Sequence, residues 1–178
     1  MDITDIILEQ HEEQRRLFGF IQETGRDNRD AISAIWRRLR DLLEAHAEAE
    51  ERYFYPHLLK EGSGSEDSGN AADETRDAIK DHNEIRDTAK DVDTHQVGSD
   101  AWFAAVDKAD LANSKHMAEE ERQGLADFRR HAPLDERHSL GVEFLAYVSR
   151  HCTGVKPVDK DPDRWVEEHE RQPQPEHA

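Results

Sequence analysis

The stretch HAEAE at residues 46–50 follows the apolar pair Leu42-Leu43 inside a long helical pattern. Because His46 and Glu50 stand four residues apart, both lie on one face of a helix. That face continues an apolar stripe formed by Ile35, Leu39, Leu42 and Leu43. A histidine and a carboxylate on a buried stripe need partners, because burying an unpaired polar group is costly.

Around this stretch, apolar residues recur with the period of a helix in four long segments and one short one. The long segments are residues 3–24, 30–59, 73–92 and 100–130, and the short one is 134–150. Pro56 is expected to kink or end the second segment, and the Gly/Ser/acid-rich insert 62–72 is expected to be a flexible loop. The sequence predicts an all-α fold, an antiparallel up-down four-helix bundle with a short fifth C-terminal helix.

The 178 residues are enough for one domain with a real core. We expect residues 1–151 to form the bundle and residues 152–178, with several prolines among charges, to form a loose polar tail. The net charge of −17 disfavours nucleic acid and anionic membranes as partners. No apolar run is long enough to cross a membrane, and the first residues lack the basic region of a signal peptide. The single cysteine, Cys152, excludes an internal disulfide, so we expect a cytoplasmic protein. No feature indicates the oligomeric state.

Each of the four long segments places one histidine near its middle, on its apolar stripe. In an antiparallel bundle, mid-helix residues meet at one level, and two of the four segments add a glutamate one turn later. The predicted cluster is His11, His46, Glu50, His82, His116 and Glu120. We expect it to bind metal; the alternative is a hydrogen-bonded His/Glu network that closes the core. His57 and Glu61 share the spacing but lie at a helix end, so we leave them out.

Four imidazoles and two carboxylates exceed the four ligands of one tetrahedral zinc ion. They suit two octahedral ions bridged by the carboxylates, and iron, manganese or zinc would accept these ligands. The ferritin-like di-iron layout needs Glu-x-x-His pairs. None of the four inward histidines has a glutamate three residues before it, so that layout is disfavoured.

The order of His11, HAEAE (46–50), DHNEIR (81–86) and HMAEE (116–120) resembles the hemerythrin-like, HHE cation-binding domain family. The run EERYFYP (50–56) is similar to that family's continuation of its second helix into a proline. The resemblance covers about residues 3–150. It implies two non-haem iron ions with carboxylate and oxo/hydroxo bridges, in which the two glutamates bridge and the histidines are terminal ligands.

Two positions depart from the oxygen-carrying members of the family, which have an HxxxH pair on the third helix. Here Ala78 and Arg86 flank His82, so one histidine is missing. The fourth-helix carboxylate, usually an aspartate five residues after the histidine, is here Glu120, four residues after His116. Both departures argue against reversible oxygen carriage.

The missing histidine leaves two alternatives, an open or water-filled position or another side chain in its place. Tyr53 continues the stripe of His46 and Glu50, so we predict that its phenol lines the site or coordinates metal. The alternative is an ordinary core tyrosine whose hydroxyl bonds to a carboxylate. Glu51 and Glu119 are expected to face outward or to accept hydrogen bonds from imidazole N–H groups.

The resulting functional hypothesis is a di-iron protein that reacts with oxygen species, foremost by catalase-like breakdown of hydrogen peroxide. The alternatives are binding or sensing of O2, NO or iron without turnover, and simple metal storage. The sequence assigns no catalytic side chain beyond the metal ligands.

Overall fold

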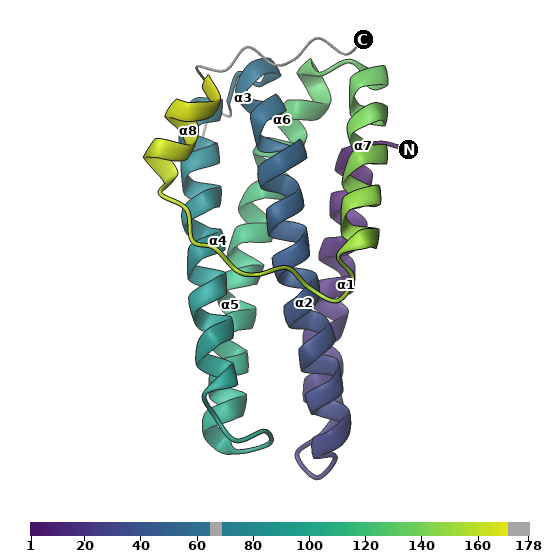
Figure 1. The fold of residues 1–178 in the computed structure, drawn as a ribbon, viewed down its shortest axis with the longest axis vertical. Coiled ribbons are helices and arrows are strands. Elements are labelled where there is room, and N and C mark those ends of the chain that lie inside the picture. Colours follow the sequence, from purple (N-terminus) through teal and green to yellow (C-terminus); the bar gives the residue numbers. More distant parts are fainter. Residues whose placement is uncertain (65–68, 171–178) are drawn as a thin grey trace.

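The computed structural model describes residues 1–64 and 69–170, and within these ranges it contains helices and no strand. Four long helices stand side by side and alternate in direction (Figure 1), which confirms the predicted antiparallel bundle. The helices are α1 (Ile3–Thr24), α2 (Arg29–Tyr53), α3 (Tyr55–Glu61), α4 (Ala71–Asp93), α5 (Asp100–Arg122), α6 (Gly124–His131), α7 (Leu134–Arg150) and α8 (Pro162–Glu170). The predicted short fifth helix is α7, which packs on α1 and α2. Among the described residues, no helix combines the length and the apolar character needed to cross a membrane.

Side-chain caps begin three of the long helices. Asp2 accepts a hydrogen bond from the Thr4 backbone N–H at the start of α1, and the Ser99 hydroxyl accepts one at the start of α5. Asn70 and Asp73 form a capping box at the start of α4. Each cap satisfies an N–H group that has no partner inside its helix.

Two of the long segments are interrupted, one as predicted and one not. The break at Phe54, between α2 and α3, lies two residues before Pro56, as expected. The prediction of one continuous helix over residues 100–130 is wrong, because the chain breaks at Gln123. A Cβ atom on Gly124 would lie only 3.2 Å from Leu58 Cδ2, so the glycine lets α6 pack closely on α3.

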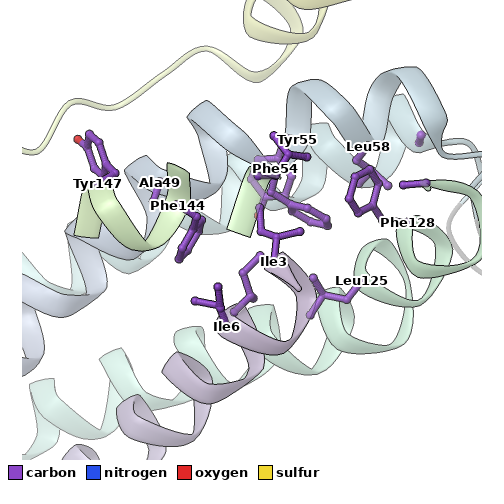
Figure 2. Close-up of a cluster of buried hydrophobic side chains, with 14 of the residues drawn as sticks. Ile3, Ile6, Ala49, Phe54, Tyr55, Leu58, Leu125, Phe128, Phe144 and Tyr147 are labelled. Atoms are coloured by element: carbon purple, nitrogen blue, oxygen red, sulfur yellow. The ribbon is translucent and has the colours of Figure 1, made fainter. Parts of the chain in front are cut away.

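The apolar core is divided into two clusters along the bundle. One cluster is built mainly from residues of α1, α3, α6 and α7, such as Ile3, Phe54 and Phe128 (Figure 2), and includes Trp165 and Val166 of α8. The other gathers residues such as Phe18 and Trp102 around the opposite ends of the four long helices. In α1, α2, α4 and α5 the predicted histidines fall between the two clusters in sequence, so the polar groups form a layer enclosed by apolar side chains.

The expectation of a loose tail after Cys152 is wrong for the residues up to 170. The chain crosses the face of α2 and α4 in an extended segment and then forms α8, which packs on α4 and α3 (Figure 1). Trp165 and Val166 of α8 are buried. Only two apolar residues anchor this helix, too few to produce a helical period in the sequence.

The predicted flexible insert is described only at its two ends. The Ser63 and Gly64 backbone N–H groups donate to the Asp127 carboxylate, and α4 already begins at Ala71. The middle of the insert, residues 65–68, lies outside the described residues.

Candidate metal centre

The structure brings all six predicted side chains together in the polar layer. They come from α1, α2, α4 and α5, and none is more than 6% exposed. Their ligand atoms form two groups that could each hold an ion, His11 with His46 and Glu50, and His82 with His116 and Glu50. Glu50 belongs to both groups, which is the arrangement of a bridging carboxylate.

Each oxygen of Glu50 faces a different pair of histidines. Oε1 lies 2.8 Å from His46 Nε2 and 3.9 Å from His11 Nε2. Oε2 lies 3.2 Å from His82 Nε2 and 4.0 Å from His116 Nε2. The second carboxylate, Glu120, places Oε2 3.4 Å from His11 Nε2. Two ions separated by Glu50 would therefore each have imidazole and carboxylate donors within reach.

The hydrogen bonding in this layer tests whether the residues fit a metal. Five buried atoms that converge here make no hydrogen bond of acceptable geometry, although His46 Nε2 and Glu50 Oε1 lie only 2.8 Å apart: His11 Nε2, His46 Nε2, both Glu50 oxygens and Glu120 Oε2. The Nε2 atoms of His82 and His116 also face each other at 3.2 Å. Orphaned buried donors and acceptors are rare and costly, and a cation would satisfy their lone pairs together. The donor set therefore fits metal ions better than the alternative of a closed hydrogen-bond network.

In three of the histidines the other ring nitrogen, Nδ1, faces away from the centre and is hydrogen-bonded to a side chain of another helix. His11 Nδ1 lies 2.9 Å from Glu121, His46 Nδ1 2.8 Å from Gln10, and His82 Nδ1 2.9 Å from Glu51. An Nδ1–H that donates outward leaves the Nε2 lone pair directed into the centre.

Glu51 and Glu119 each take one of the two roles predicted for them: Glu51 accepts from an imidazole N–H, and Glu119 lies toward solvent. The Glu119 side chain is 35% exposed and lies 4.0 Å from Lys115. Sequence reasoning missed Gln10 and Glu121. Each is next to a ligand in sequence but serves a histidine of a different helix, so no local pattern marks it.

Arg86, at one of the two positions where the missing histidine could stand, supports the centre from outside. Its guanidinium donates to Glu44 at 3.0 Å and to Glu51 at 3.0 Å. Both carboxylates are buried, so Arg86 neutralises charge next to His82.

The structure places Tyr55, rather than Tyr53, in the centre. The Tyr55 hydroxyl donates to Glu120 Oε1 at 2.7 Å and lies 3.5 Å from His82 Nε2. Tyr53 is half-buried and packs its ring against Tyr147. Tyr53 is the last residue of α2, and there its ring faces Tyr147 rather than the centre. The chain then breaks at Phe54 and directs Tyr55, the first residue of α3, inward, which the helical period of α2 does not predict. Pro56 marks this break in the sequence.

Without metal, the centre balances its charges with protons. Burial lowers the pKa of His11, but the neighbouring carboxylates of Glu120 and Glu121 outweigh burial and raise it to about 9. The pKa of His82 is likewise raised to about 9, because Glu50 and Glu51 outweigh burial. Burial, helped by the charge of Glu50, raises the pKa of Glu120 to about 7. Because metal ligands must be deprotonated, an incoming cation has to displace these imidazole protons.

A small cavity leads toward the centre between α3, α4 and α5. It encloses about 20 Å³, room for one water-sized molecule. Its lining includes exposed Asp77 at one side and Tyr55, His116 and Glu120 at the other. His57 lies elsewhere, with its Nδ1 2.7 Å from Glu136, and stays outside the centre as predicted.

Comparison with known proteins agrees with this geometry. Residues 2–126 match the family model described as the hemerythrin HHE cation binding domain. Neither a curated protein nor a solved structure gives a significant match. The matched residues cover more than half of the chain and include all six clustered side chains and Tyr55. The chain therefore belongs to the hemerythrin HHE cation-binding family and is a metal-binding protein.

Proposed function

We propose that the protein holds two iron ions in this centre and breaks down hydrogen peroxide to water and oxygen. The observation that carries the proposal is the shared Glu50, whose two oxygens face separate histidine pairs in a layer with five unpartnered polar atoms. One ion alone would leave one of the pairs unsatisfied.

The residues that would hold the ions divide into two sets. His11 and His46 would hold one ion and His82 and His116 the other, with Glu50 between them. Glu120 would supply the second carboxylate. Tyr55, beside Glu120 and His82, would stand in for the missing histidine. Bound iron would supply a reversible two-electron change, so that one peroxide is reduced to two waters and another is oxidised to oxygen.

The protein contributes three things: a cavity that leads to the centre, the exclusion of bulk water, and a protonated tyrosine. The two apolar clusters exclude bulk water from the layer, which strengthens the electrostatic interactions inside it. The cavity of about 20 Å³ suits a small polar molecule such as peroxide. Burial, with the charges of Glu120 and Glu50, raises the pKa of Tyr55 well above its ordinary value. In the metal-free centre the phenol therefore keeps its proton and donates a hydrogen bond to Glu120.

The experiment is metal analysis of protein from iron-supplemented cells, combined with visible spectra and an oxygen electrode during peroxide addition. We expect two irons per chain, bands that respond to peroxide, and oxygen evolution at half the peroxide consumed. Two irons whose bands shift with O2 or NO but evolve no oxygen from peroxide would replace turnover by binding or sensing. A chain that holds little metal and is equally stable with chelator would refute the centre itself.

A further inference from the structure

We propose that the C-terminal segment, residues 153–170, is a working part of the metal centre, in which Lys160 and Trp165 are positioning residues for His82 and Tyr55. This segment lies beyond the matched residues 2–126. The inference rests on the metal centre proposed above but does not require that the centre turns over peroxide.

Lys160 reaches the centre through one carboxylate. Its Nζ forms ion pairs with Glu51 and, at 2.6 Å, with Glu48. Glu51 in turn accepts from His82 Nδ1. An ammonium, a carboxylate and a ligand imidazole therefore form a continuous chain from the C-terminal segment to the metal.

The two oxygens of Glu51 have separate partners. Oε1 accepts from His82 and from Arg86, whereas Oε2 is the atom that Lys160 holds. Glu51 is only 2% exposed, so bulk water cannot readily replace the lysine. Without Lys160, one oxygen of a buried carboxylate would lose its charged partner, and the carboxylate would be free to rotate away from His82.

The backbone of Lys160 is fixed beside the same ligand. The Asn83 side chain donates to the Lys160 carbonyl at 2.8 Å and accepts from the Lys160 N–H at 3.2 Å. Asn83 directly follows His82, so α4 anchors the C-terminal segment next to the histidine that the segment supports. A lysine on a loose tail would lose much rotamer freedom on forming such an ion pair; here its backbone is already held.

Trp165 is the second positioning residue, and it contacts Tyr55. Its ring lies edge-to-face against Tyr55, with 6.4 Å between centroids and an interplanar angle of 88°. Tyr55 is held between this tryptophan and its hydrogen bond to Glu120. Edge-to-face packing fixes the orientation of both rings, so α8 sets where the phenol points.

The segment also lies near the outer side of His82. Residues 153–157 line a cavity of about 450 Å³ together with His82 and Arg86. In Figure 1 this extended part of the segment crosses in front of α2 before it reaches α8. Displacing the C-terminal segment would expose the Glu51–His82 hydrogen bond to water. A hydrogen bond is weaker in water than in a buried site of low dielectric constant.

The test compares Lys160→Met with Lys160→Arg, which keeps the charge, and with Asp163→Asn. Asp163 forms an exposed ion pair with Arg76 at 2.9 Å, so its substitution removes a charge from the same segment without touching the centre or the buried anchors of α8. In full-length, iron-loaded protein, we measure the iron released to a chelator, the visible bands, and the melting temperature of the metal-free chain. Removing a partner of a ligand imidazole commonly weakens metal binding about 10–100-fold.

We expect Lys160→Met to bind iron at least about tenfold more weakly and to shift the visible bands. Lys160→Arg should restore both properties, and Asp163→Asn should match the wild type. If Lys160→Met fails to fold, Lys160→Gln replaces it in the same comparison. The inference is overturned if the lysine variant keeps wild-type affinity and bands, or if Asp163→Asn weakens iron binding equally. Wild-type protein without iron would overturn the metal centre and this inference together.

Discussion

Replacing Glu50 with glutamine tests the shared carboxylate directly. The change keeps the shape of the side chain but turns one of its two oxygens into an amide nitrogen, which cannot act as a ligand, and removes the negative charge. Because the two oxygens face different histidine pairs, the substitution should impair both ions. His46→Gln and His116→Gln should each impair one.

The expected size follows from the number of ions that each variant loses. An ion present at a hundred times its dissociation constant stabilises the folded chain by about 2.7 kcal/mol. Two ions would then contribute about 5 kcal/mol, which raises the melting temperature of a domain of this size by roughly 10–20 °C. Glu50→Gln should lose nearly all of that increase, and the single histidine variants about half.

The assay is metal content per chain together with thermal unfolding at matched free iron, with and without chelator. Comparing each variant with its own metal-free form removes the direct effect of the substitution on the fold. The bridging role is refuted if Glu50→Gln retains two ions, or if it loses no more metal and no more metal-dependent stability than His46→Gln.

Three further results are expected. Tyr55→Phe removes the donor of a buried hydrogen bond to Glu120, so it should lower the free energy of unfolding of the metal-free chain by about 1–2 kcal/mol. It should also change the visible spectrum of the iron-loaded protein, whereas Tyr53→Phe should leave that spectrum unchanged. In the metal-free chain, His11 and His82 have pKa values of about 9, so their contribution to stability is complete below about pH 6.5 and is lost as the pH rises through 9. Metal uptake near pH 7.5 should therefore release protons, and calorimetry in buffers of different ionisation enthalpy would measure them; uptake without proton release would contradict this. Gly19 lies exposed within α1 with open space around its Cβ position, so Gly19→Ala should raise the free energy of unfolding by about 1 kcal/mol in denaturant titration.

The layered core shows how this bundle accommodates a costly site. Apolar clusters on both sides of the polar layer hold the four long helices together. The layer itself contains unpartnered atoms of His11, His46, Glu50 and Glu120. The fold therefore positions the candidate ligands before a metal binds. Metal binding should raise the free energy of unfolding, because it would satisfy the polar atoms in this layer that lack hydrogen bonds.

The sequence by itself determined the four long helices of the bundle and which of their faces carry the candidate metal ligands. Helical periodicity is a local property, so the stripe through His46 and Glu50 could be followed within one segment. The same reasoning on the other long segments found His11, His82 and His116. It needed only the assumption that antiparallel helices bring their middles to one level.

Tertiary structure alone decided what surrounds those ligands. Gln10, Glu51 and Glu121 serve histidines of other helices, so their roles depend on how the helices are rotated against one another. Tyr55 replaced Tyr53 because the chain turns at Phe54, beyond which the helical period no longer predicts direction. Lys160 reaches Glu51 from more than a hundred residues away in sequence. Such contacts are fixed by packing between distant segments, and no periodicity within a single segment contains that information.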